Sequence, residues 1–407
     1  MIETEIIARI RANLMERLEF MEEVSDEELQ AMISEELRKL NKEEHIPINA
    51  RISIGKQIFD AMRKLDILQE FLEDHSVTEI MINGPGCIFV ERKGRLFKVN
   101  QQFDSEETLR NVIGQIVAKC NRVVNDSNPI VDARLLDGSR VNVVLNPVAI
   151  NGPILTIRRF PEKPFLMEDL VRIGSITEEA ADFLHDLVIA GYNIIVSGGT
   201  GSGKTTFLNA LSAYIPNDER IITIEDSAEL QIQGIDNLVR LETKNANVEG
   251  ATPIVIRDLI KTSLRMRPNR IIVGEVRGPE AMDMVCSAMN CGHDGSMSTV
   301  HANSAADSIS RLETMILMAA SLPIHAIHRQ ICSGVDIIVH LGRMRDKSRR
   351  VLEIVELLDD ETNSINPLFR FTEDDNATRE KVSGQLIRVG DLINENKLEN
   401  AGLLARI

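Results

Sequence analysis

Residues 192–206 read YNIIVSGGTGSGKTT, an apolar run followed by a loop of glycine, serine, threonine and one lysine. The loop meets the spacing G-x-x-x-x-G-K-[ST], and an apolar strand before it and a helical pattern after it supply the context that this motif requires. Glycines allow backbone N–H groups to surround a polyphosphate, the lysine adds positive charge, and the threonine hydroxyl is placed to ligate Mg²⁺. A Gly/Ser linker that contained a lysine by chance would lack those flanking elements. The sequence therefore predicts a site for ATP and Mg²⁺ formed by Gly198, Gly199, Thr200, Gly201, Ser202, Gly203, Lys204, Thr205 and Thr206.

Three further apolar strands end in residues that could act on a bound phosphate. IITI is followed by Glu225 and Asp226, RIIVG by Glu275, and GSMSTV by His301. In an open parallel sheet the carboxyl ends of the strands line one ligand crevice, so these side chains are expected to converge. A phosphate site closed by acidic groups and a histidine favours hydrolysis of the nucleotide.

Glu275 is predicted to polarise the attacking water, as a base at the end of an apolar strand can. The residue before it is Gly274, where many nucleotide hydrolases carry an aspartate that orients magnesium. Glu225 and Asp226 are therefore predicted to hold Mg²⁺ together with Thr205. The alternative is that Glu225 and Asp226 cap the segment that follows them.

The histidines near the fourth strand have two readings. An isolated histidine is more often structural, but His301 follows a strand of small and hydroxylated residues in the same domain as the phosphate loop. We therefore expect His301 to contact the γ-phosphate. His293, just after Cys291-Gly292, is expected either to bind the nucleotide or to hold the loop.

Four arginines cluster within 26 residues upstream of the phosphate loop, on or near predicted strands: Arg134, Arg140, Arg158 and Arg159. Exposed arginine usually solvates a surface. Guanidinium groups also clamp phosphates during phosphoryl transfer, so some of this cluster is expected to reach the nucleotide.

Composition limits the class of protein. The chain has 407 residues, 43% hydrophobic and 27% charged, which predicts a globular protein of several domains. No apolar run approaches the length of a membrane span, and the charged start does not resemble a secretory signal, so a cytoplasmic location is expected. A net charge of −16 and 3% aromatic residues argue against a nucleic-acid partner. The five cysteines lack metal-site spacing, and Cys291 with His293 has no second pair to complete a tetrahedral site.

The predicted secondary structure changes several times along the chain. Helical periodicity predicts an N-terminal helical bundle over 1–75, with a capping box at Ser25 and Glu28 and a helix over 52–73. Strands and a helix predict an α+β N-terminal domain over 76–160, with a hairpin turn at Asp137-Gly138. A linker over 161–166, an α/β domain over 167–358, and a polar extension over 359–407 that ends in a helix complete the expected organisation.

Two charged segments have an ordinary and a sharper interpretation. Residues 1–46 hold 13 acidic and 6 basic side chains, which is typical of a solvated face but would also suit docking of a basic partner. Residues 343–350, RMRDKSRR, suit a solvated hairpin turn or a basic contact with a membrane surface.

The motifs, taken together, resemble one family. GGTGSGKTT, TIEDSAEL, RMRPNRIIVGEVRG and GHDGSMSTVHAN occur in the order of the Walker A, Asp box, Walker B and His box of the secretion and type IV pilus ATPases, where Gly-Glu is the usual Walker B pair. Within this family the chain is most similar to the CpaF/TadA-type ATPases of tight-adherence (Flp) pili, in the sequences NGP near 83, RLLDGSRVN and VRLET. The resemblance covers about 50–358.

The resemblance implies a RecA-like P-loop domain preceded by the α+β domain, and a cytoplasmic homohexamer with ATP between the domains. It implies a motor for pilus assembly, retraction or secretion that works on inner-membrane platform proteins, and hence peripheral association with that membrane. By motif position, the arginine fingers fall on Arg140 and Arg158, with Arg134 and Arg159 as weaker candidates. The alternatives are a conjugation or type IV secretion ATPase, a nucleic-acid motor, and a nucleotide-gated scaffold without hydrolysis.

Overall fold

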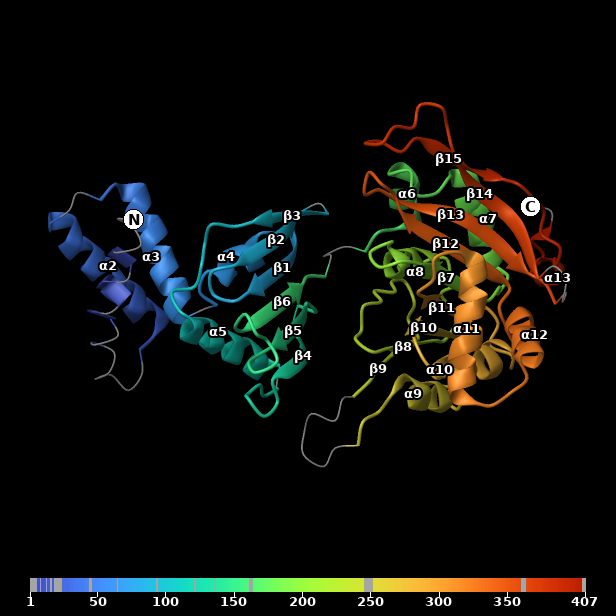
Figure 1. Cartoon of the computed structure of the whole chain (residues 1–407), viewed down its shortest axis with the longest axis horizontal. Coiled ribbons are helices and arrows are strands. Elements are labelled where there is room, and N and C mark those ends of the chain that lie inside the picture. The colour runs from blue at the N-terminus through green and yellow to red at the C-terminus, as the bar shows by residue number, and fades with distance from the viewer. Residues whose placement is uncertain are drawn as a thin grey trace. The chain divides into compact units, whose positions relative to one another are not determined.

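The chain forms two compact units, 1–161 and 162–407, in the computed structural model of Figure 1. The structure describes residues 24–404 apart from 44–45, 64, 93, 121, 136, 161–163, 245–251 and 360–363. Of the first 23 residues it describes 6–7, 9–11, 13–14 and 17. The expected linker over 161–166 therefore lies partly outside the described residues.

The N-terminal helices form a small bundle with its own core. Its long helices are α2 (Asp26–Glu43) and α3 (Ile48–Arg63), and the buried Ile10 and Leu14 pack with them. The capping box predicted before α2 is confirmed: the Ser25 N–H donates to Glu28 Oε2 at 2.8 Å and the Glu28 N–H to Ser25 Oγ at 3.2 Å.

The single helix expected over 52–73 is divided. Asp66 has a φ of 53°, a left-handed conformation that does not continue an α-helix, and α4 (Leu68–Glu73) begins just after it. Leu65, Leu68 and Phe71 are buried in the core of the neighbouring antiparallel sheet rather than in that of the bundle. The tertiary contacts of α4 therefore override the continuous helical pattern of the sequence.

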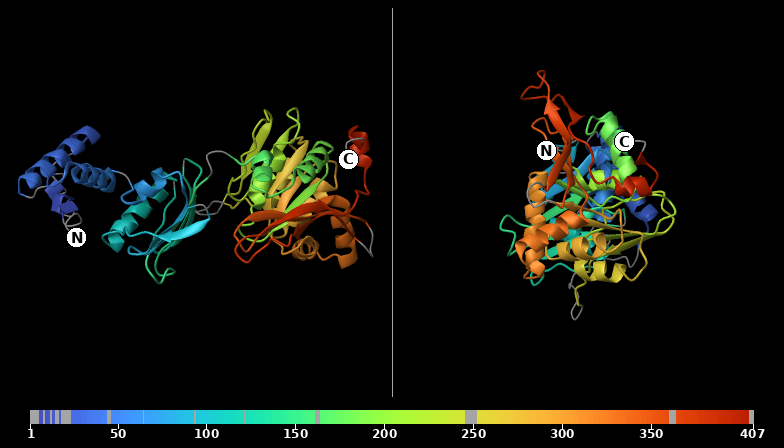
Figure 2. Two further views of the ribbon diagram at one scale, coloured as in Figure 1. Left: turned by 90° about the horizontal axis from the view of Figure 1, so that it is seen from above. Right: turned by 90° about the vertical axis from the view of Figure 1, so that its right-hand side faces the viewer.

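A six-stranded antiparallel sheet completes the first unit. Its strand order is β3-β2-β1-β6-β5-β4, and α5 (Glu106–Lys119) lies beside the sheet (Figures 1 and 2). The buried side chains of α5 belong to the core of this sheet. The predicted turn at Asp137-Gly138 joins β4 to β5, with Gly138 at a φ of 90°. The strands are β1 (Val77–Asn83), β2 (Ile88–Arg92), β3 (Arg95–Lys98), β4 (Ile130–Arg134), β5 (Arg140–Val144) and β6 (Ile154–Arg158).

The second unit is built on a nine-stranded sheet of order β15-β14-β13-β12-β7-β11-β10-β8-β9. From β12 to β9 neighbouring strands are parallel, whereas β12 to β15 pair antiparallel. The strands are β7 (Ile194–Gly198), β8 (Ile221–Glu225), β9 (Leu238–Glu242), β10 (Arg270–Val276), β11 (Met297–Val300), β12 (Ile337–Arg343), β13 (Arg349–Leu357), β14 (Ile365–Glu373) and β15 (Gly384–Arg388).

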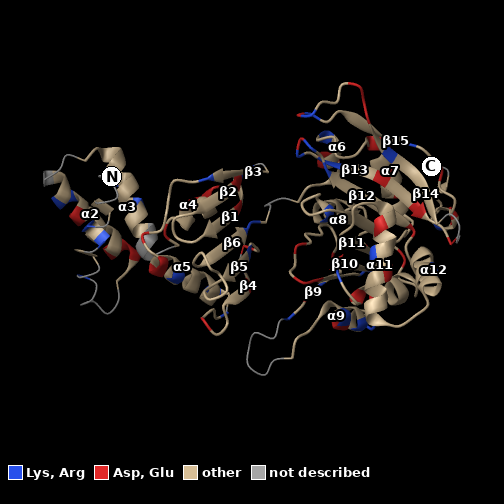
Figure 3. Cartoon of the chain, viewed as in Figure 1, with Lys and Arg blue, Asp and Glu red and all other residues tan. Residues whose placement is uncertain are grey.

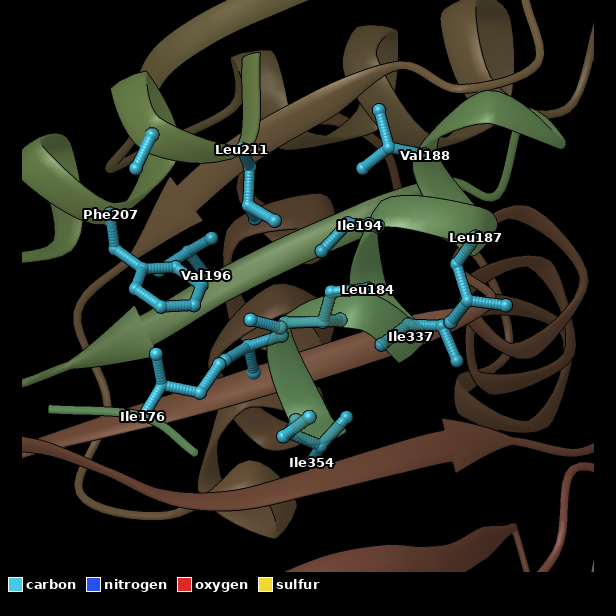
Figure 4. Packing of buried hydrophobic residues seen from close by; sticks show 14 of the residues in the cluster. Ile176, Leu184, Leu187, Val188, Ile194, Val196, Phe207, Leu211, Ile337 and Ile354 are labelled. Carbon is cyan, nitrogen blue, oxygen red and sulfur yellow. The ribbon is translucent and has the colours of Figure 1, made fainter. Parts of the chain in front are cut away.

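Helices pack on both faces of this sheet, because β7 and β8 are buried throughout and need apolar cover on each side. One core, shown in Figure 4, joins α6 (Met167–Arg172), α7 (Glu178–Ile189) and α8 (Lys204–Ser212) to the sheet. The other joins α9 (Ile256–Ser263), α10 (Glu280–Met282), the π-helix η1 (Asp283–Met289), α11 (Ala305–Ala319) and α12 (Ile324–Gly334). The predicted α/β fold with a P-loop is confirmed.

The C-terminal segment differs from the expected polar, helical extension over 359–407. Two of its parts form β14 and β15 and extend the nine-stranded sheet, and only then does the short helix α13 (Asn396–Asn400) follow. Leu368, Phe369 and Leu386 are buried in the same core as α7 and α8. The sequence did not predict these strands, because their few apolar residues lie among many acidic ones. Of the helices that the structure describes, none has both the length and the apolar surface needed to cross a bilayer.

Candidate nucleotide site

The phosphate loop connects β7 to α8, as the motif predicts. Gly203 precedes α8 with a φ of 97°, and Gly201 has a φ of 70°, conformations that favour glycine. At Gly198 a Cβ atom would lie 2.4 Å from the carbonyl oxygen of Leu341 on β12. The loop is therefore held close to β12, and side chains at these positions would distort it.

Lys204 is folded back onto the loop. Its buried ammonium donates to the carbonyl oxygens of Gly198 at 3.0 Å and Gly199 at 3.2 Å. Burial lowers the pKa of Lys204 from its ordinary value. The ammonium group that the motif predicts for phosphate binding thus contacts two carbonyl oxygens of its own loop.

His301 stands between Lys204 and Glu275. Its Nε2 lies 3.3 Å from Lys204 Nζ and 3.3 Å from Glu275 Oε1. Burial, and then the nearby Lys204 charge, lower the pKa of His301, so the ring is neutral at neutral pH. The predicted convergence of Lys204, Glu275 and His301 is seen in the structure.

Glu275 has a second partner that sequence reasoning missed. Arg277 donates to Glu275 Oε2 from Nε at 2.8 Å and from a terminal nitrogen at 2.6 Å. The Glu275 side chain is 18% exposed, so the pair lies partly shielded from solvent at the end of β10. The sequence could have indicated this contact, because Arg277 lies two positions after the predicted base.

Glu225 is almost completely buried, at 3% exposure. Its Oε1 accepts the N–H groups of Glu229 at 2.8 Å and Leu230 at 2.9 Å, so the alternative reading of a cap holds for this oxygen. Its Oε2 is buried without a hydrogen-bond partner. Burial raises the pKa of Glu225 to about 7.

Gly274 leaves room for that carboxylate. A Cβ atom at Gly274 would lie 2.9 Å from Cγ and 3.2 Å from Oε1 of Glu225. Many nucleotide hydrolases carry an aspartate at this position. Here an aspartate side chain would collide with Glu225. The two positions compensate each other: glycine on β10 permits a buried glutamate on β8.

The oxygen groups available for Mg²⁺ are few. Asp226 is exposed, with Oδ2 4.0 Å from Arg277, and Thr205 lies in the first turn of α8. Among the described residues there is no cluster of three or more His, Cys, Asp or Glu side chains that could hold a metal ion unaided. Mg²⁺ in such sites uses one or two protein groups with phosphates and water, so the unpartnered Glu225 Oε2 and the Thr205 hydroxyl are suitable donors.

His293 is not near the phosphate loop within the chain. It precedes β11, and its neighbour Asp294 lies against Gly191, just before β7. The phosphate loop follows the carboxyl end of β7, so the length of a strand, about 13 Å, separates the two edges. His293 therefore lies at the opposite end of its strand from His301, and the fold does not bring it to the phosphate loop of the same chain.

The predicted arginines lie in the first unit, in one row across its sheet. Arg134 faces Arg140, and Arg140 faces Arg158, on adjacent strands. Arg134 donates to Gly138 O at 3.2 Å, and Arg159 donates to Asp74 O at 2.5 Å, so both have structural contacts.

The segment 343–350 contributes to the site in a way that its charge pattern did not reveal. Arg349 Nε donates to Gly201 O at 2.9 Å, beside the phosphate loop. Arg345 pairs with Glu373 through two contacts of 2.6 Å, and Arg350 donates to Gly174 O at 2.9 Å. The signal was topological: β12 pairs with β7, so the turn after β12 must lie near the loop after β7. Figure 3 marks Lys and Arg residues in blue in this part of the chain.

Known proteins resemble this chain in sequence or in fold. The family described as "Type II/IV secretion system protein" matches residues 61–387. The conjugal transfer protein TrbB of Rhizobium radiobacter is 34% identical over 70% of this chain and 85% of its own length. The type IV secretion system protein VirB11 of Brucella suis is 34% identical over 68% of this chain and 84% of its own. Among solved structures, the pilus retraction motor PilT with bound ADP covers 84% of this chain and 89% of its own, with 19% identity and a TM-score of 0.51.

Replacement of Gly274 by aspartate is expected to destabilise the second unit. The new Cβ would crowd a buried side chain, and overpacking of this kind costs about 1–3 kcal/mol. Chemical denaturation would measure the change in the free energy of unfolding. Gly114→Ala is the control, because a Cβ there meets nothing within 4 Å and α5 favours alanine. Equal stability of Gly274→Asp and the wild type would contradict the packing of Glu225 against Gly274.

Stability is expected to fall as pH rises from about 4.5 to 7. The pKa of Glu225 is about 7 in the folded chain and near 4.5 when unfolded, so the folded state binds more protons in this interval. The loss is at most about 3 kcal/mol and ends above the folded pKa. Denaturation at several pH values would show a smaller slope for Glu225→Gln, which keeps the Oε1 acceptor but cannot titrate. Identical slopes for the two proteins would contradict the raised pKa.

Proposed function

We propose, because the chain belongs to the type II/IV secretion system protein family, that this ATPase is a motor that acts on an inner-membrane secretion or pilus machine. The observation that carries the proposal is the convergence of Lys204, His301 and Glu275 at the carboxyl ends of neighbouring strands, with both contacts of His301 at 3.3 Å. A charged lysine, a neutral imidazole and a carboxylate at a phosphate loop suit hydrolysis of a nucleoside triphosphate.

Each residue has a distinct task in this mechanism. The loop N–H groups surround the phosphates, and Lys204 leaves the carbonyls of Gly198 and Gly199 for the terminal phosphates. Glu275 orients the attacking water and accepts its proton, and Arg277, which donates to Glu275 Oε2, holds that carboxylate in position. His301, neutral, donates a hydrogen bond to the γ-phosphate. Mg²⁺, when bound, neutralises phosphate charge, and Thr205, Glu225 and Asp226 would hold it.

The machine that the motor serves has two candidates. The motifs resemble those of the ATPases of tight-adherence pili, which favours assembly or retraction of a pilus on platform proteins at the cytoplasmic face of the membrane. The relatives TrbB, a conjugal transfer protein, and VirB11, a type IV secretion system protein, favour conjugation or type IV secretion equally well. A motor that grips nucleic acid directly is less favoured, because 3% aromatic residues offer few stacking surfaces.

A homohexameric ring suits this function. Arg140 and Arg158 are adjacent on the sheet of the first unit, at the edge of β5 and β6 from which the chain continues to the second unit. We propose that they reach the phosphates of a nucleotide bound by the second unit of the same or a neighbouring subunit. ATP hydrolysis would then move the two units against each other.

Glu275→Gln is expected to abolish ATP turnover while preserving ATP binding. Loss of the base should lower kcat at least about a hundredfold. Turnover and equilibrium binding of ATP would be measured together, with Glu242→Gln, an exposed strand-end glutamate on β9, as the control. Unchanged turnover in Glu275→Gln would favour a nucleotide-gated scaffold instead.

The ring is tested by mass in solution. Light scattering with ADP and with a non-hydrolysable ATP analogue should give a hexamer in at least one state. Arg140→Ala and Arg158→Ala should lower turnover without loss of ATP binding, whereas Arg95→Ala, on the exposed β3, should not. A strict monomer in both states would rule out the ring.

A further inference from the structure

A groove runs between α2 and α3 in the N-terminal bundle, with a volume of about 650 Å³. We call it the α2–α3 groove. Among the described residues that line it, none is acidic, three are basic and five are large and apolar: Gln30, Ile33, Ser34, Leu37, Arg38, Ile48, Arg51, Ile52, Gly55, Lys56 and Phe59.

The floor of the α2–α3 groove is apolar and extends to the surface. Ile33 and Leu37 are buried beneath it, and a Cβ at Gly55 would lie 3.3 Å from Leu37, so Gly55 opens space between the helices. Ile48 and Ile52, one helical turn apart on α3, are 64% and 67% exposed. Two large exposed side chains beside an apolar channel offer anchoring contacts for the apolar face of another helix.

The rim of the α2–α3 groove carries two guanidinium groups that have no anionic partner among the residues that the structure describes. Neither Arg38 nor Arg51 has a side-chain hydrogen bond or ion pair with any residue that the structure describes, and Nε of Arg51 is buried without a partner. Lys56 has one exposed contact, to Glu73 at 3.1 Å. Unpaired guanidinium groups beside an apolar floor favour carboxylates on the ligand.

Three of the acidic residues of α2 are engaged by other groups. Glu28 closes the capping box with Ser25, and Glu35 and Glu36 pair with Lys39 and Arg17 at 2.8–3.2 Å. Figure 3 marks acidic residues of α2 in red; these three have cationic or backbone partners, whereas Arg38 and Arg51 at the groove have none among the described residues. The charge of the docking surface is thus opposite to that which the overall acidity of the segment suggests.

We propose that the α2–α3 groove binds an acidic amphipathic helix of a partner protein. The apolar stripe of that helix would cover Ile48, Ile52 and Phe59, and carboxylates along its edge would pair with Arg38 and Arg51. Charge complementarity selects this occupant over a basic segment. The inference is independent of the nucleotide site.

The test uses two synthetic helical peptides with the same leucine stripe, one with glutamate and one with lysine at the flanking positions. Fluorescence anisotropy with the full chain should show the glutamate peptide binding at least about tenfold more tightly, with the difference shrinking at high salt. Ile52→Asp should abolish binding of both peptides. Equal binding of the two peptides, or none, would overturn the proposal.

Charge reversal identifies the groove as the site. The double variant Arg38→Glu with Arg51→Glu should reverse the preference between the peptides. Ser34→Glu, at an exposed position of α2, should weaken binding of the glutamate peptide. Arg95→Glu, on β3, is the control that should leave binding unchanged. Circular dichroism verifies that each variant folds. If anionic phosphatidylglycerol vesicles bind through Arg38 and Arg51 while the glutamate peptide does not, the surface is a membrane contact and the proposal fails.

Discussion

The pairing of β7 with both β11 and β12 is the constraint on which the nucleotide site depends. It brings three loops to one edge of the sheet: the phosphate loop after β7, His301 after β11, and the turn that leads from β12 to Arg349. Gly198 shows how tight this arrangement is, because a Cβ there would lie 2.4 Å from a carbonyl oxygen of β12. A shift of one residue in either register would move the phosphate loop away from His301 or drive it into β12.

Sequence reasoning predicted the features that local chemistry determines. The phosphate loop, the strand ends with Glu225, Glu275 and His301, and the capping box at Ser25 each depend on neighbouring residues and a known geometry. The family match over residues 61–387 supports the resemblance that these motifs indicated. Features that depend on distant contacts were less accessible. Asp66 interrupts a helix because α4 packs on another core. β14 pairs with β13 through backbone hydrogen bonds, which the pattern of side chains does not predict.

Direction along a strand was the other source of error. His293 and His301 lie eight residues apart in the sequence, but a buried strand separates them, so only one stands at the phosphate edge. Arg349 shows the converse: it is far from the loop in sequence and donates to Gly201 O in space. For Glu225 the structure shows the cap at one oxygen, and the other oxygen is buried without a partner.

The folded-back position of Lys204 changes what nucleotide affinity measures. Its two bonds to loop carbonyls, at 3.0 and 3.2 Å, are intramolecular competitors of the phosphate. Nucleotide binding is then an exchange reaction, in which the observed free energy is the phosphate contact minus the backbone contacts given up.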